Sequence, residues 1–161
     1  MARGIGALLL LGCSLYLGAC LAGVEKWRVR QYEGFLLLVR HIRNGITCFQ
    51  TPIEKIYAGF ANAALERCGL LPALRAGVDL STALQRCREE LYVEAEAWRT
   101  LSAFAREVGK SYTQEQAKLC DYTIKELEIA LHRQKEEAPR RARGARALAV
   151  CGGLALLILL L

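Results

Sequence analysis

The chain of 161 residues is poor in proline and histidine and lacks the sequence signatures of catalysis. Its three prolines and the absence of alternating strand-like runs argue against a β-rich fold and favour helices. His41 and His132 have no paired-ligand spacing around them, so we expect surface histidines rather than metal ligands. No phosphate-binding loop, G-x-S-x-G or C-x-x-C occurs. We therefore predict a protein that is not an enzyme and binds no cofactor, metal or small-molecule substrate.

The seven cysteines do not suggest a disulfide framework, because an odd number leaves one thiol over in any pairing. Three of them lie in apolar segments and four are spaced widely between those segments. A free cysteine behaves as a small hydrophobic residue. We expect space-filling thiols in a reducing compartment. The residues are Cys13, Cys20 and Cys151, and then Cys48, Cys68, Cys87 and Cys120.

The net charge of +6 does not indicate nucleic-acid binding once it is placed along the chain. All 16 acidic residues lie between Glu25 and Glu137. The stretch 25–138 holds 17 Lys and Arg, which is the 22 of the whole chain less Arg3 and the four arginines at 140–146. The positive excess therefore flanks the apolar ends, where it suits acidic lipid headgroups. We predict a lipid bilayer as a partner and no nucleic acid.

Each end of the chain carries a long apolar stretch. Gly4–Gly23 has about twenty uncharged residues, the length of a transmembrane helix. Ala147–Leu161 would extend about 22 Å as a helix, and counting back to Gly144, with arginines reaching the headgroups, brings it near a full span. We predict a transmembrane helix at each end. At the N-terminus a cleaved signal peptide and a lipoprotein signal, the latter suggested by Leu17-Gly18-Ala19-Cys20, remain open alternatives.

The charges beside these stretches predict one topology. Basic residues follow the first stretch and precede the last, so the positive-inside rule puts the intervening segment in the cytoplasm and both termini outside. We accordingly divide the chain into an N-terminal transmembrane helix (1–24), a cytoplasmic helical domain (25–139), and a basic flank with a C-terminal transmembrane helix (140–161). The membrane-flank residues that carry this prediction are Arg3, Lys26, Arg28, Arg30, Arg140, Arg141, Arg143 and Arg146.

The predicted fold is all-α, a membrane-anchored bundle of about five to six helices with a transmembrane helix at each end. We expect the first helix to continue to about Gly45 and to bury Phe35, Leu38, Val39 and Ile42. A capping box over 51–54 predicts the next helix, which stops at Gly69. A short helix at 72–75 follows.

Three further helices complete the expected bundle. Ser81 is expected to cap a helix that carries Leu84, Cys87 and Leu91. The spacing of Trp98, Leu101, Phe104 and Ala105 predicts a helix over 94–108, ended by Gly109. A second capping box over 113–116 starts the longest helix, which is expected to end before Pro139. Its apolar positions are Ala117, Cys120, Ile124, Leu127 and Leu131.

The order of these features resembles the stage III sporulation protein AB family of endospore-forming Firmicutes. An N-terminal apolar helix is followed by Thr51-Pro52-Ile53-Glu54, Leu80-Ser81, Val108-Gly109 and a helix bearing Gln116. The chain then ends in Cys151-Gly152-Gly153-Leu154 and further leucines. The resemblance covers essentially the full length. The family usually has Leu-Gly where this chain has Val108-Gly109.

The resemblance implies a domain similar to the cytoplasmic domain of the type II secretion inner-membrane platform protein, the F component. It also implies membership of the AA-to-AH set that is needed for a channel between mother cell and forespore. The implied partners are the other proteins of that operon, above all the AA-type ATPase of the mother-cell cytosol. The implied location is the mother-cell membrane around the forespore. A general secretion or pilus-assembly platform, and an exported lipoprotein or envelope enzyme, remain open alternatives.

Overall fold

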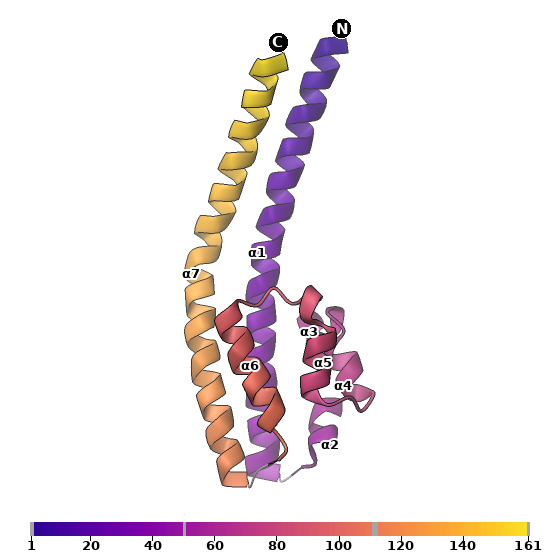
Figure 1. Cartoon of the computed structure of the whole chain (residues 1–161), viewed down its shortest axis with the longest axis vertical. Coiled ribbons are helices and arrows are strands. Elements are labelled where there is room, and N and C mark those ends of the chain that lie inside the picture. The colour runs from indigo at the N-terminus through magenta and orange to yellow at the C-terminus, as the bar shows by residue number, and fades with distance from the viewer. Residues whose placement is uncertain (1, 50, 111–112, 161) are drawn as a thin grey trace. The chain divides into compact units, whose positions relative to one another are not determined.

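The computed structural model describes residues 2–49, 51–110 and 113–160 (Figure 1). Within these residues the chain forms α-helices and one short 3-10 helix but no strand, which confirms the all-α prediction. The α-helices are α1 (Ala2–Phe49), α2 (Ile53–Ala58), α3 (Ala63–Arg67), α4 (Leu70–Arg75), α5 (Leu80–Arg86), α6 (Ala95–Glu107) and α7 (Thr113–Leu160). The 3-10 helix η1 (Arg88–Glu90) lies between α5 and α6.

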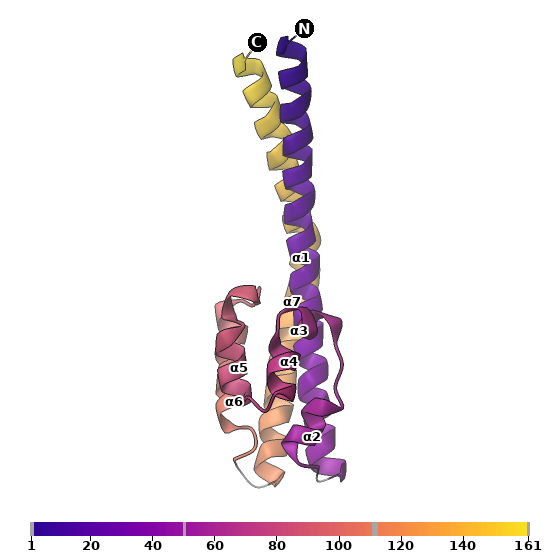
Figure 2. The same cartoon turned by 90° about the vertical axis from the view of Figure 1, so that its right-hand side faces the viewer.

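The chain divides into two compact units. The first, which we call the core unit, is Arg28–Arg133. The second, the end unit, combines Met1–Trp27 with Gln134–Leu161. In the end unit the first part of α1 and the last part of α7 run in opposite directions (Figures 1 and 2). Both ends of the described chain are helical. Among the described residues, however, no helix carries a stretch long and apolar enough to cross a bilayer, and the predicted membrane passage therefore lacks support.

The hydrophobic centre of the core unit is built around α1. Phe35, Leu38, Val39 and Ile42 are at most 1 % exposed, as their spacing of three and four residues predicts. Helix α6 contributes Leu101, Phe104 and Ala105, and α7 contributes Cys120, Leu127 and Leu131. These positions confirm the predicted apolar stripes of α1 and α6 and most of that of α7, where Ala117 is half-buried and not part of the core cluster. Trp98, Ile124 and other partly buried side chains pack at the margin.

The helix predicted to run from the Thr51 capping box to Gly69 is instead two helices, α2 and α3. Asn62 ends the break, because its side-chain oxygen accepts hydrogen bonds from the amides of Ala64 and Leu65 at 3.0 and 3.2 Å. The Thr51 capping box is also wrong. Helix α2 begins one residue later than that box requires, so Pro52 occupies the N-cap and no side chain caps it.

Two other helix boundaries test the capping predictions. Asp79 caps α5 in place of Ser81, since its carboxylate accepts a hydrogen bond from the Thr82 amide at 2.9 Å. Hydrogen bonds from the Thr82 side chain and amide lower the pKa of Asp79. The predicted end of α6 is confirmed. Gly109 has φ = 85°, a left-handed conformation that glycine adopts without strain.

Pro139 does not end the last helix, contrary to the prediction. Helix α7 runs through it to Leu160. A proline removes one amide from the helix ladder and interior prolines cost about 3 kcal/mol. The segments on both sides are rich in alanine, leucine, arginine and glutamate, which are strong helix formers. Arg143 Nε also donates a hydrogen bond to the Pro139 carbonyl at 3.2 Å.

Candidate functional site

The described residues contain no cluster of three or more His, Cys, Asp or Glu side chains that could hold a metal ion. His132 is exposed, as expected. His41 is half-buried. Its Nε2 lies 3.2 Å from the Ile56 carbonyl oxygen and its ring lies 5.3 Å from that of Phe60. Contacts with α2 and the following loop therefore give His41 a packing role.

The six cysteines with described side chains carry no disulfide. Cys68, Cys87 and Cys120 are buried in the core unit. Burial raises the pKa of Cys120 to about 11 and also raises that of Cys68, because a thiolate is poorly solvated there. These buried groups are neutral thiols near pH 7, which suits filling of space better than nucleophilic chemistry. Cys20, Cys48 and Cys151 are exposed.

Two side chains of α1 hold the segment between η1 and α6 in place. Gln31 is fully buried, and its amide donates to the Glu90 carbonyl and accepts from the Tyr92 amide, both at 2.8 Å. Tyr32 accepts a hydrogen bond from the Glu94 amide at 3.1 Å through its hydroxyl. These bonds satisfy backbone groups of the last residue of η1 and of the loop that leads into α6. They fix where α6 begins relative to α1.

The sequence analysis did not predict these hydrogen bonds of Gln31 and Tyr32, although one signal was available. Gln31 stands four residues before Phe35, in register with the apolar face of α1, where a polar side chain must find partners. Its partners are about sixty residues away in the chain, so only the fold reveals them. The guanidinium of Arg88 also makes a cation–π contact with Trp98, with its Cζ atom 4.5 Å from the centroid of the ring.

Exposed ion pairs join α1 to α7 on the surface of the core unit. Arg40 pairs with Glu128. Arg43 pairs with Asp121 through two nitrogens, and its second contact is 3.3 Å. The hydrogen bond to Asp121 is the main reason why the pKa of Arg43 is raised. Because both pairs are solvent-exposed, they set surface charge and helix register more than stability.

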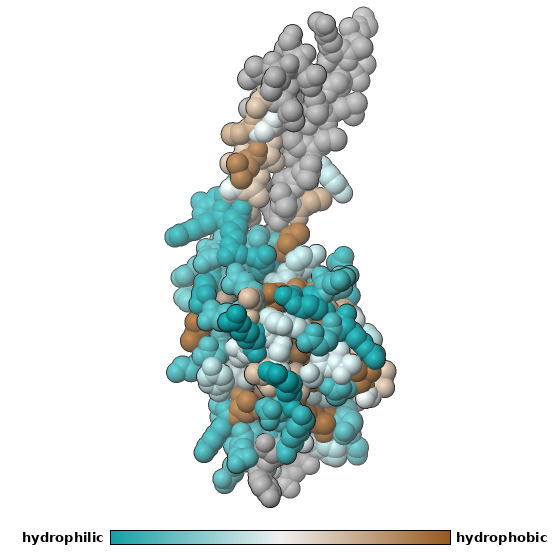
Figure 3. Space-filling view, viewed as in Figure 1, coloured by the Kyte–Doolittle hydropathy of each residue, from teal (hydrophilic) through white to brown (hydrophobic). Residues whose placement is uncertain are grey.

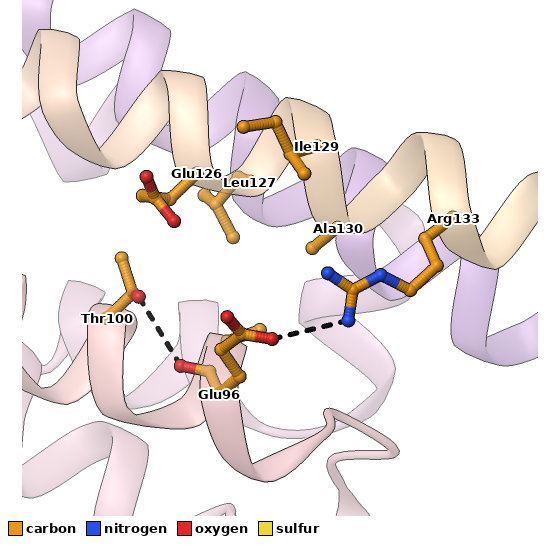
Figure 4. Close-up of a pocket in the computed structure, with 8 residues that line it drawn as sticks. Glu96, Thr100, Glu126, Leu127, Ile129, Ala130 and Arg133 are labelled. Atoms are coloured by element: carbon orange, nitrogen blue, oxygen red, sulfur yellow. Dashed lines mark hydrogen bonds and ion pairs between the residues drawn. The ribbon is translucent and has the colours of Figure 1, made fainter.

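A small groove lies between α6 and α7, entirely within the core unit (Figure 4). Its volume of about 20 Å³ has room for a water-sized group, far below the several hundred Å³ of a cofactor site. On one side Glu96 accepts from Arg133 at 3.3 Å, and the Thr100 hydroxyl donates to the Glu96 carbonyl. The full lining is Glu96, Ala97, Thr100, Glu126, Leu127, Ile129, Ala130 and Arg133.

The predicted membrane-flank residues are distributed over both units. Lys26, Arg30, Arg140, Arg141 and Arg143 are exposed. Arg28 is half-buried in the core unit. Arg141 pairs with Glu137 one turn earlier on α7. The side chains of Arg3 and Arg146 lie outside the described part of the structure.

The face of the core unit seen in Figure 3 is mainly hydrophilic, with apolar side chains in separate small patches. The large apolar side chains exposed in this unit are Leu37, Tyr92, Tyr122 and Ile129. Apolar side chains scattered singly in this way are normal on a protein surface and do not by themselves mark a binding site.

Comparison with known proteins decides the family. A sequence model described as stage III sporulation protein AB matches residues 3–161. The chain belongs to the stage III sporulation protein AB family. This membership confirms the resemblance drawn from the order of sequence motifs, and it implies a role at stage III of sporulation. No curated protein and no solved structure matches the chain.

Proposed function

We propose that this chain is a non-enzymatic platform protein of a channel between mother cell and forespore. In this proposal the core unit lies in the mother-cell cytoplasm and couples an AA-type ATPase to the membrane components of the channel. The end unit holds the platform at the membrane around the forespore. The observation that carries the proposal is the match to the stage III sporulation protein AB family over residues 3–161.

The charges of the end unit support attachment to a membrane. Exposed arginines on α7 precede the apolar stretch 147–160, and exposed Lys26 follows the apolar stretch of α1. Acidic lipids attract such flanks with about 1 kcal/mol per basic residue near the surface. Both flanks are basic on the side that leads into the core unit, so both favour a cytoplasmic core unit.

The construction of the core unit supports a coupling role. Gln31 and Tyr32 tie the start of α6 to α1, and the ion pairs of Arg40 and Arg43 tie α7 to the same helix. Helices α1 and α7 also continue into the end unit. A force applied to α6 or α7 by a cytosolic motor would therefore be passed to helices that enter the membrane-associated part.

Labelling of Cys48 tests the orientation. Its side chain is exposed in the core unit, so a membrane-impermeant maleimide should reach it only after cells are permeabilised. Mass spectrometry of the peptide that contains Cys48 gives the labelled fraction directly. Labelling in intact cells would place the core unit outside the cytoplasm and refute the platform. Isolation of the full chain in detergent from sporulating cells should also recover the ATPase, and recovery of pilus components instead would favour the secretion alternative.

A further inference from the structure

The groove between α6 and α7 contains a carboxylate without a counter-charge. Of the acidic side chains in the described part of the chain, Glu126 combines partial burial with the lack of any hydrogen-bond or ion-pair partner. The residues one turn away on α7 are Tyr122, Thr123, Ile129 and Ala130, and none of them is a cation. The one guanidinium of the groove, that of Arg133, is engaged by Glu96.

The surroundings of Glu126 combine apolar side chains with a net negative charge. Figure 4 shows Glu126 and Arg133 toward opposite ends of the groove, with Leu127, Ile129 and Ala130 between them on α7. Ile129 is 49 % exposed, so the rim leaves an apolar side chain in water. The lining carries two carboxylates and one guanidinium, an excess of one negative charge.

We infer that this groove is a docking site for a basic side chain of a partner protein, a contact that rests on the proposed platform function. The aliphatic stem of the incoming residue lies on Ala97, Ala130 and Ile129, and its cationic head binds Glu126. Arginine is the best match, because its forked guanidinium forms two parallel bonds to a carboxylate while its methylenes cover apolar surface. The groove itself holds no more than a water-sized group, so the incoming side chain lies across its rim and only its tip approaches Glu126.

The test places a photo-crosslinking amino acid, p-benzoylphenylalanine, at position 129 of the full chain in its native host during sporulation. We expect an adduct with a partner protein, mapped to a segment that bears an arginine or lysine. Glu126→Lys should reduce its yield about tenfold, which corresponds to about 1.4 kcal/mol. Reversal of the mapped basic residue to glutamate should restore the adduct in the Glu126→Lys background. Circular dichroism checks that each variant keeps its helical fold.

Glu115→Lys is the matched control, since Glu115 is an exposed carboxylate on α7 that does not line the groove. It should leave the adduct unchanged. An equal loss with both variants, an adduct on a second copy of this chain, or no rescue by charge reversal would overturn the inference. Adducts from probes at Leu37 or Tyr92 with none at 129 would overturn the groove and leave the platform intact. No adduct from any of these positions would count against both.

Discussion

A substitution of Gly34 by alanine tests the packing of α1 against α3. In an open helix this change raises stability by about 0.5–1 kcal/mol, because alanine is the better helix former. Here a Cβ atom would lie 2.8 Å from Asn62 Oδ1 and 3.0 Å from Leu65 Cγ. Leu65 is fully buried and cannot move into solvent. The Asn62 oxygen would have to leave the two amides that it caps.

The expected cost of Gly34→Ala follows from these contacts. Loss of an N-cap costs about 0.5–2 kcal/mol, and overpacking a core costs about 1–3 kcal/mol. After the gain in helix propensity, we expect a net loss of about 1–2 kcal/mol. For a unit of this size that lowers the melting temperature by roughly 5–10 °C. Urea unfolding of the full chain in nanodiscs, followed by tryptophan fluorescence, measures the loss.

Two further variants serve as controls for the effect of Gly34→Ala. Gly144→Ala is the control, since nothing lies within 4 Å of a Cβ there, and it should be neutral or mildly stabilising. Asn62→Gly removes the clashing oxygen at a cost of only a few tenths of a kcal/mol, because glycine is tolerated at N-caps. In that background Gly34→Ala should lose at least half of its cost. A stabilising Gly34→Ala, or a cost unchanged by Asn62→Gly, would refute the proposed contact.

The remaining predictions concern one buried amide, two thiols and the basic flank. Gln134→Leu should raise the free energy of unfolding by about 1 kcal/mol in the same assay, because Gln134 is 1 % exposed and its amide has no partner among the described protein groups. A loss of stability would show that the amide is satisfied. Iodoacetamide at pH 8 should modify exposed Cys48, whereas Cys120, with its pKa raised to about 11, should react only as the pH approaches that value or after unfolding. Equal rates in the native protein would contradict its burial. Replacement of the four arginines of the basic flank by glutamate should disturb membrane insertion or orientation; these residues are Arg140, Arg141, Arg143 and Arg146. Carbonate extraction measures the insertion and Cys48 labelling measures the orientation. An unchanged result in both assays would show that these charges are incidental.

The parts of the fold that were predictable from sequence are those set by local periodicity. The apolar faces of α1, α6 and α7 follow from spacings of three and four residues. The end of α6 at Gly109 follows from the chemistry of glycine, the residue type that adopts positive φ without strain. Family membership was predictable for a related reason, since it depends on the order of short motifs along the chain.

The features that sequence missed depend on competition between local signals or on distant contacts. Asp79 lies two residues before Ser81, which is also an acceptable cap, and Asn62 lies inside a segment whose pattern predicts one continuous helix. Only the packed structure selects between these possibilities. Pro139 is a helix breaker by its own chemistry, but strong helix formers on both sides outweigh it. The groove that holds Glu126 is assembled from two helices that are separated by a turn, so its unpaired carboxylate has no signature in either helix alone.

We propose that this chain is a structural part of the channel between mother cell and forespore. The most direct measurement is a clean deletion of the gene in the native host, with microscopy of cells induced to sporulate. We expect arrest after engulfment, with forespores that fail to mature, and recovery when the full chain is supplied in the mother cell. Normal, mature spores in the deletion strain would contradict it.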